Sequence, residues 1–483
     1  RSVSTDAVVR GLTGLSAVDA FRRLSRLPHC LFFDSADQQS GLGRYSYLMA
    51  DPYQWLEGSS GDGSDLQRLA GRLAVSDSST ADGRSDSADE LPPFRGGAAG
   101  VVSYDFGRRL ERAPAARFDE FPVPGLAAGL YDVVAAFEHK KGRQPGRAWL
   151  ISTGRPAAHP ADRRRRAAER CEQFLACLDR ASVEDDTFGG AKARLPTATP
   201  RAPQHPVDGL AGVTSSFSRE GYLAAVRRAV EYIHAGDIFQ VNLSQRLLAE
   251  QREPSVDVYL RLREQNPAPF AGYADLGGVQ VCSASPERFL SVADGRIETR
   301  PIKGTRPRSA DAGVDQRLAA ELLAHPKDRA ENIMIVDLLR NDLSRVSTPE
   351  SVRVPTLCAL ESYRHVHHLV SVVEGRLAAG RTAVDLLRVA SPGGSITGAP
   401  KVRAMQIISE LEPTARGAYC GSLFWAGFNG AMDSSILIRT ATCAGGWVQT
   451  PVGGGIVADS DPATEYEETL HKARGMLTTA AVL

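Results

Sequence analysis

A lysine in the segment RPIKGTRPR could act as a nucleophile. Lys303 lies between a strand-like run and a Gly-Thr turn at 304–305. An amine that burial keeps neutral can attack an electrophilic carbon. The alternative is an ordinary solvated loop lysine, which is the commoner situation for this residue type. Taken alone, Lys303 would be read as a solvated loop lysine, but its sequence neighbours favour the nucleophile.

Two pairs of acids with the same spacing predict a site for a hard cation. Asp328 and Glu331 are spaced to share one face of a helix, and Glu465 and Glu468 repeat that spacing on a helix expected to begin at Pro462. Brought together, four carboxylates would repel one another without a cation. Mg²⁺ typically takes one or two direct carboxylates and keeps several waters. We therefore predict a magnesium site in which one Glu of each pair is a direct ligand. The alternative is that these acids are solvated at helix starts, where the macrodipole favours them.

Glycine-rich segments indicate weaker possibilities. The run 453–455 consists of three glycines, which could bring backbone N–H groups close to a carboxylate beside the metal. The segment SPGGSITGAPK at 391–401 lacks the Gly-Lys-Ser/Thr ending of a phosphate loop, so we expect no nucleotide site there. Tyr419 and Arg439 are a single aromatic residue and a single arginine in strand-like surroundings, and on their own they indicate a structural role.

The composition is that of an ordinary globular protein. Across 483 residues, 57 Lys and Arg balance 57 Asp and Glu, so we expect neither nucleic acid nor a membrane as partner. The seven cysteines are scattered without a CxxC pair, which favours a reducing environment. No apolar run approaches the roughly 18 residues of a membrane span, and the start, RSVSTDAVVRG, lacks a secretory pattern. We therefore expect a cytoplasmic location.

The elements that must position these residues form a mixed α and β pattern. Short strand-like runs dominate the first half, whereas the second mixes strands with helices, of which the clearest are predicted at 218–236 and 327–345. The polar segment 58–92 is expected to include a surface loop. Three regions follow from these patterns: an N-terminal region at 1–180, a Pro-rich connector at 181–215, and a catalytic region at 216–483.

Taken in order, these segments resemble the chorismate-utilising enzymes. In that family the ammonia-dependent synthases of anthranilate and of 4-amino-4-deoxychorismate stand beside isochorismate and salicylate synthases. The resemblance covers nearly the whole chain, and it is carried by FFDSADQQSGLGRYSYLMADP, GVVSYDFGRRLE, GDIFQVNLSQ, NPAPFAGY, SASPERFL, RPIKGTRPR, DRAENIMIVDLLRNDLSRV, VHHLVS, SPGGSITGAPK and GGGIVADSDPATEYEET. It implies an α/β body of two opposed β-sheets packed face to face, with helices outside, in which the two halves of the sequence interlock.

The resemblance implies a metal and two carboxylate clamps. The Mg²⁺ ligands would be Glu331 and Glu468, with Asp328 and Glu465 acting through water, as the acid spacing also predicts. The residues expected to hold chorismate are Tyr419 and Arg439 at the enolpyruvyl carboxylate, Gly454 and Gly455 at the ring carboxylate, and Gln240, Thr305, His368 and Lys472. Because chorismate is a dianion, one metal clamp and one arginine clamp suit its two carboxylates.

The resemblance also implies the nucleophile. Gln240 takes the position at which isochorismate and salicylate synthases carry a water-activating lysine, which favours ammonia. Aminodeoxychorismate synthases read PIKGT around Lys303, whereas anthranilate synthases usually read PIAGT. We therefore expect Lys303 to attack C2 while Glu287 protonates the hydroxyl leaving C4, after which ammonia adds at C4 and displaces the lysine. This activity would serve p-aminobenzoate and folate biosynthesis. His368 matches a histidine linked to pyruvate loss in lyases, but synthases that keep pyruvate carry it as well.

The sequence also bears on the source of ammonia and on two alternative functions. None of the cysteines has the G-x-C-x-G context of a glutaminase, so we expect a separate glutamine amidotransferase subunit. The nearest alternative is anthranilate synthase of tryptophan biosynthesis. A more distant one is a non-catalytic relative that senses tryptophan, because Asp34 and Ser35 resemble the segment where some family members hold that ligand. The presence of Glu287 and Lys303 argues against the latter.

Overall fold

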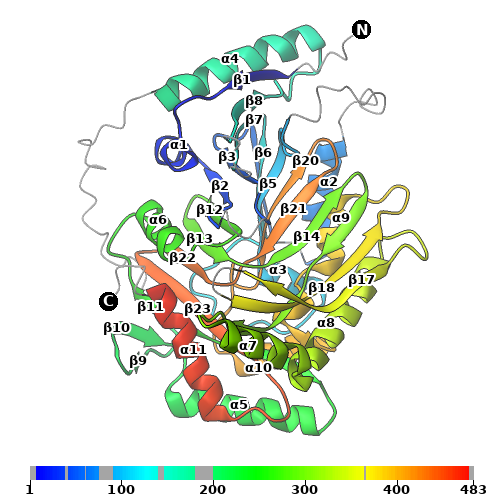
Figure 1. Ribbon diagram of the computed structural model, residues 1–483. Helices are drawn as coiled ribbons and strands as arrows, with labels where there is room; N and C mark the ends of the chain where they lie inside the picture. Colours follow the sequence, from blue (N-terminus) through cyan, green and yellow to red (C-terminus); the bar gives the residue numbers. More distant parts are fainter. Residues whose placement is uncertain are drawn as a thin grey trace.

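Two antiparallel sheets form the centre of the molecule (Figure 1). The computed structural model describes residues 7–37, 42–59, 61–74, 91–139, 146–179, 200–363 and 366–477. In this part of the chain, the 13-stranded sheet has the order β1 (Val8–Gly11), β8 (Ala148–Ser152), β7 (Val133–Glu138), β3 (Tyr45–Met49), β2 (Leu31–Asp34), β12 (Phe270–Asp275), β13 (Val279–Ser285), β22 (Thr440–Ala444), β23 (Trp447–Ile456), β11 (Gln240–Glu250), β10 (Leu210–Ser215) and β9 (His205–Val207), with β19 (Gly398–Ala399) also on β11.

The second sheet has 10 strands among the described residues. Its order is β16 (Ile302–Pro307), β18 (Val366–Arg376), β15 (Arg296–Thr299), β14 (Arg288–Ala293), β21 (Met432–Ile436), β20 (Ser422–Gly427), β5 (Gly97–Val102), β6 (Leu126–Tyr131) and β4 (Gln54–Gly58), with β17 (Arg353–Ser362) also on β18. Met49 and Val281 of the first sheet pack with Val101 and Leu423 of the second in one buried cluster. The sheets therefore face each other, as the resemblance implied.

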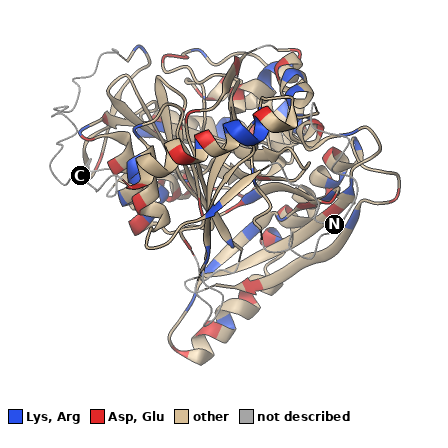
Figure 2. Ribbon diagram, turned by 90° about the horizontal axis from the view of Figure 1, so that it is seen from above, with Lys and Arg blue, Asp and Glu red and all other residues tan. Residues whose placement is uncertain are grey.

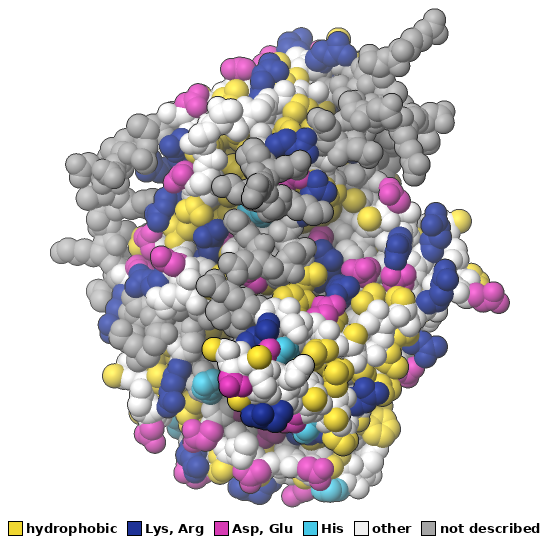
Figure 3. Space-filling model, viewed as in Figure 1, with side chains coloured by type: hydrophobic (Ala, Val, Ile, Leu, Met, Phe, Trp, Pro, Cys, Tyr) yellow, Lys and Arg dark blue, Asp and Glu magenta, His cyan; other side chains and the backbone are white. Residues whose placement is uncertain are grey.

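Helices cover the outside of this pair of sheets (Figure 1). They are α1 (Ala17–Leu24), α2 (Ser64–Ala74), α3 (Tyr104–Leu110), α4 (Pro160–Asp179), α5 (Arg219–His234), α6 (Ser255–Gln265), α7 (Ala312–Ala324), α8 (Pro326–Ser344), α9 (Ala383–Ala390), α10 (Lys401–Leu411) and α11 (Pro462–Leu477). In the described residues, none is long and apolar enough to cross a membrane. Figures 2 and 3 show basic and acidic residues interspersed along the helices and over the visible face, so electrostatic effects must be local.

The halves of the sequence share both sheets. Asp34 of β2 pairs with Ala271 of β12 in the larger sheet, and Val102 of β5 pairs with Ser422 of β20 in the smaller one. The predicted connector 181–215 ends in two strands of the larger sheet, β9 and β10, while its residues up to 199 lie outside the described part. The regions drawn from composition therefore contribute strands to common sheets.

Local sequence signals explain the helix starts near the site. The two helices predicted at 218–236 and 327–345 are α5 and α8, within two residues at each end. Helix α11 begins at Pro462 as expected, and the Thr464 N–H donates to Asp461 Oδ1 over 2.9 Å.

The segment 58–92, which was expected to include a surface loop, also contains a helix that the sequence did not predict, because residues 64–74 form α2. Leu66 and Leu69 of this helix are buried three residues apart on one face, and such an apolar stripe outweighs a polar local composition. Residues 75–90 lie outside the described part.

Candidate active site

Lys303 and Glu287 contact the same residue, Ser395. Lys303 lies on β16 and its Nζ donates to the Ser395 carbonyl oxygen over 3.2 Å. Glu287, immediately before β14, accepts a hydrogen bond from Ser395 Oγ over 3.1 Å. Ser395 belongs to a short 3₁₀ turn, Gly394–Ile396, within the glycine-rich segment 391–401. The amine and the carboxyl that the sequence singled out are thus held by one turn.

Burial changes the acidity of Glu287. Its side chain is surrounded by protein, which raises the pKa of Glu287 to about 7, although the Lys303 charge and the Ser395 hydroxyl both act to lower that pKa. A carboxyl with such a pKa carries a proton in a large share of molecules at neutral pH. Glu287 can therefore donate a proton to a leaving group, which an ordinary carboxylate cannot do efficiently.

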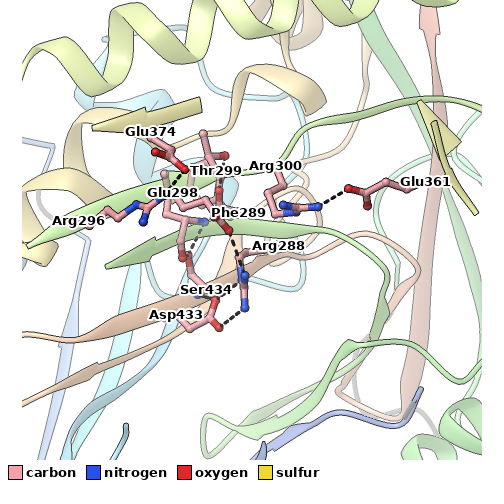
Figure 4. A network of polar contacts seen from close by, with 11 residues as sticks. Arg288, Phe289, Arg296, Glu298, Thr299, Arg300, Glu361, Glu374, Asp433 and Ser434 are labelled. Carbon is pink, nitrogen blue, oxygen red and sulfur yellow. Dashed lines mark hydrogen bonds and ion pairs between the residues drawn. The ribbon is translucent and has the colours of Figure 1, made fainter. Parts of the chain in front are cut away.

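Two arginines beside Glu287 and Lys303 tie the strands of these residues to other strands of the sheet. Arg288 Nε and Nη2 donate to the two Asp433 carboxylate oxygens, each over 3.1 Å, and so tie β14 to β21 (Figure 4). Arg300, just before β16, pairs with Glu361 of β17. A forked arginine pair of this kind fixes geometry as well as charge. Ion pairs to β21 and β17 of the same sheet thus hold β14 and the start of β16 in place.

The two acid pairs come together between α8 and α11. Burial raises the pKa of Glu331, and the nearby charges of Asp328 and Glu468 add to that effect. Burial also raises the pKa of Glu465, again with a contribution from Glu468. The Lys303 charge acts on Glu331 as well, in the opposite direction. The acids therefore form one negative cluster that faces the candidate nucleophile.

This cluster fits a cation with few direct protein ligands. Glu468 pairs with Lys472 over 2.7 Å, and Asp328 with Arg306 over 3.3 Å, so neither acid is left without a counter-charge. In the described ranges no three His, Cys, Asp or Glu side chains are arranged as a ready metal centre. The donor set is all oxygen and comes from two helices, which is the chemistry of Mg²⁺ that keeps most of its water.

The glycine-rich end of β23 lies against both the acids and Gln240. A Cβ on Gly454 would fall 3.3 Å from Glu465 Oε2 and 3.8 Å from Glu468 Oε1. A Cβ on Gly455 would fall 2.3 Å from Gln240 Nε2. Gln240 is fully buried, and neither atom of its amide has a hydrogen-bond partner in the described residues. A buried amide without a partner is costly, so this position suits a bound polar molecule.

Adding a methyl group at Gly455 is expected to weaken substrate binding. In Gly455→Ala the new Cβ would displace the Gln240 amide, whose far end can swing away, and we expect the KM for chorismate to rise about tenfold, a binding loss near 1.4 kcal/mol. Steady-state kinetics and the melting temperature would be measured together. Gly278→Ala is the matched control, because a Cβ there meets nothing within 4 Å. An unchanged KM in Gly455→Ala would mean that the Gln240 amide does not contribute to substrate binding.

A third group of predicted residues surrounds a histidine. Thr305 Oγ1 and His368 Nδ1 lie 2.9 Å apart, across the paired strands β16 and β18. Burial, with a contribution from the Arg439 charge, lowers the pKa of His368 to about 4, so its ring is neutral at pH 7. Its uncharged state leaves Arg439 as the cationic member of this group.

Arg439 is available for an anionic ligand. It has a positive φ of 50° directly before β22 and forms an ion pair with none of the described acids. Surrounding protein lowers the pKa of its guanidinium although the side chain still reaches solvent, which places it in a partly desolvated position. Tyr419 is buried one residue before Cys420, whose N–H donates to the Leu437 carbonyl oxygen over 2.8 Å. The tyrosine and the arginine thus come from adjoining segments.

A buried ion pair that the sequence did not single out supports this arrangement. Arg416 and Glu412 are both buried and lie 2.6 Å apart. Arg416 also donates to the Ile396 carbonyl oxygen over 3.0 Å and to the Asn242 carbonyl oxygen over 2.8 Å. It thereby ties the turn that carries Ser395 to β11. A lone Arg-Glu pair at i, i+4 is common on helices, so only the buried surroundings distinguish it.

Ser35 lies apart from these groups, in a cavity of about 340 Å³. Its Oγ donates to the Tyr45 carbonyl oxygen over 2.8 Å, and aromatic and polar side chains including Trp425 and Arg288 complete the lining. Asp34 lies at the same place, with its carboxylate accepting a hydrogen bond from the Tyr259 hydroxyl over 3.0 Å. The assignment of this cavity to tryptophan stays a prediction.

Comparisons with known proteins agree in pointing to one family. The model of the family described as chorismate binding enzyme matches residues 28–478. Over 388 residues the chain is 44% identical to anthranilate synthase component 1 of Thermus thermophilus, covering 80% of this chain and 78% of that protein. Over 389 residues it is 43% identical to aminodeoxychorismate synthase component 1 of Klebsiella aerogenes, covering 80% and 77%. The crystal structure of anthranilate synthase component I from Streptococcus pneumoniae superimposes with a TM-score of 0.73 at 32% identity, covering 90% and 92%. The chain belongs to the chorismate binding enzyme family.

Proposed function

We propose that this protein is an aminodeoxychorismate synthase of the component I type. It would convert chorismate and ammonia to 4-amino-4-deoxychorismate and water, for p-aminobenzoate and folate biosynthesis. The observation that carries the proposal is the position of Lys303, which is held by Ser395 beside the protonatable Glu287 and faces Glu331. Overall identity does not separate this activity from anthranilate synthesis, because relatives of both names are about equally similar.

Residues of this chain are proposed for each step of the substitution. The Lys303 amine forms a bond to C2 of chorismate, the ring double bond shifts, and the C4 hydroxyl leaves as water with the proton from Glu287. Ammonia then bonds to C4, the double bond returns, and Lys303 leaves. A proton from the incoming nitrogen restores Glu287. Dividing the substitution in this way replaces one difficult displacement by two easier ones.

The carboxylates of chorismate would be held at the two ends of the site. Arg439 and Tyr419 are proposed to bind the enolpyruvyl carboxylate, and the Gly454 and Gly455 backbone the ring carboxylate. Glu331 and Glu468 would hold Mg²⁺ directly, with Asp328 and Glu465 holding it through water. When bound, the ion supplies positive charge that attracts the ring carboxylate.

The ammonia is proposed to come from a separate glutamine amidotransferase subunit. The similar proteins are named component 1, which supports a second component for this chain as well. With such a division of labour, the chain alone would use ammonium salts but not glutamine.

Identifying the product tests the proposal. The protein would be incubated with chorismate, Mg²⁺ and ammonium at mildly alkaline pH, and the product analysed by mass spectrometry. We expect an amine that retains the enolpyruvyl group, and no product when glutamine replaces ammonium. Anthranilate together with released pyruvate would instead assign the chain to tryptophan biosynthesis. Tight tryptophan binding without any consumption of chorismate would indicate a non-catalytic relative.

A further inference from the structure

Ser395 makes hydrogen bonds to three side chains of the candidate active site, which come from three different segments. Its carbonyl oxygen accepts hydrogen bonds from Lys303 Nζ over 3.2 Å and from Asn242 Nδ2 over 3.1 Å. Its hydroxyl donates to Glu287 Oε1 over 3.1 Å. One residue therefore joins the amine on β16, the carboxyl before β14, and the strand β11.

The turn that carries Ser395 is held in place on both sides. A Cβ on Gly394 would fall 2.1 Å from Leu338 Cδ2 of α8, so the backbone packs directly on that helix. The Ile396 carbonyl oxygen accepts a hydrogen bond from the buried Arg416 over 3.0 Å. Thr397 Oγ1 donates to the Gly393 carbonyl oxygen over 3.0 Å, which closes the turn on itself. Ser395 is thus a fixed point to which the reacting side chains are attached.

We propose that Ser395 is a positioning residue for the reaction, whose hydroxyl orients Glu287 toward the leaving group and whose carbonyl oxygen orients the Lys303 amine. This assignment deepens the proposed function and rests on it for the roles of Glu287 and Lys303. Neither contact requires Ser395 to touch the reacting atoms. The contribution comes from restricting two flexible side chains to reactive positions.

The groups around Glu287 determine how loss of the hydroxyl would be observed. Lys303, from β16, and the Ser395 hydroxyl both lower the pKa of Glu287, while burial raises it. The Cys420 thiol also faces Glu287, but burial holds the pKa of that thiol far above neutrality, at about 12, so it stays uncharged. Without the Ser395 hydroxyl, only the Lys303 charge would still lower the pKa of Glu287 against the effect of burial. The carboxyl would then keep its proton to a higher pH.

The test is the pH dependence of Ser395→Ala, measured as disappearance of chorismate so that it does not depend on which product forms. We expect kcat to fall about 10- to 100-fold, the worth of a hydrogen bond to a charged group. We also expect the alkaline limb of the profile to move to higher pH. Ser395→Thr, which keeps a hydroxyl, should restore most of the rate and the original limb. Ser409→Ala is the matched control, because among the described residues that hydroxyl bonds only within its own helix, at the Met405 carbonyl oxygen.

A coupled variant distinguishes positioning from a general loss of structure. In a Glu287→Gln background, Ser395→Ala should have little further effect, because the hydroxyl acts through the carboxyl. Equal effects in both backgrounds, or an alkaline limb that Ser395→Ala leaves unmoved, would overturn the assignment. If Ser395→Ala does not fold, Ser395→Thr is compared with Ser395→Cys. The alkaline limb should then move to higher pH in Ser395→Cys but not in Ser395→Thr, and an equal limb in both would overturn the assignment. Production of anthranilate by the unmodified protein would refute the proposed function while leaving this test of Ser395 intact.

Discussion

Lys303→Ala is expected to lose formation of the C4-amino product by on the order of 10³-fold, equivalent to about 4 kcal/mol of activation free energy. Alanine removes the amine that is proposed to attack C2. In the unmodified protein the Ser395 carbonyl oxygen, on a fixed turn, holds that amine in place. Lys303→Arg is the matched variant. It keeps a positive charge near Glu331 but cannot become a neutral nucleophile. Product formation by mass spectrometry should be equally low in both variants.

A trapping experiment checks the same prediction by a different route. Without ammonia, the first step should leave the substrate skeleton attached to the peptide that contains Lys303, and intact-protein and peptide masses would reveal the adduct. Substantial activity in Lys303→Arg, together with no adduct in the unmodified protein, would mean that the lysine serves only as a charge beside Glu331 and the metal site.

Glu287→Gln is expected to lower kcat by about 10²- to 10⁴-fold, the usual contribution of a positioned general acid. Glutamine keeps the size of the side chain and can still contact Ser395, so binding of chorismate should change little. Because the protonated form is the active one and the pKa of Glu287 is about 7, the activity of the unmodified protein should fall as pH rises through that value. The residual activity of Glu287→Gln should lack this limb. Rate profiles across pH 5 to pH 9 would be compared; a limb that persists in Glu287→Gln would assign it to another group.

Features governed by local periodicity could be predicted from the sequence. Helices α8 and α11, which carry Asp328, Glu331, Glu465 and Glu468, follow from apolar spacing and from prolines at or near helix starts. Helix α2 could not, because its polar composition concealed the spacing of a few leucines that are buried only by tertiary packing. The pairing of strands far apart in the sequence came from the resemblance, since periodicity gives no information about which strands are neighbours.

The reactive side chains were easier to find than the residues that hold them. Lys303 and the acids stand out because their chemistry is distinctive, whereas their joint position depends on tertiary packing, in which α8 lies on β16 and α11 lies on β23. Ser395, Asn242 and Arg416 were missed because serine, asparagine and arginine are common and their contacts depend on tertiary structure. The one available signal was the run of small residues at 391–401, which allows close approach of α8 but has no fixed chemical meaning.

The sharing of both sheets between the halves of the chain has a kinetic consequence. Pairing of Asp34 with Ala271, and of Val102 with Ser422, requires the closure of very long loops before the sheets can be completed. Folding rates fall as the sequence separation of contacting residues rises. During synthesis, β2 and β5 emerge long before their partners β12 and β20, and their unpaired edges must wait while the intervening chain is made. This protein should therefore fold slowly and late, and depend on chaperones during its synthesis more than a protein of the same size built from local contacts.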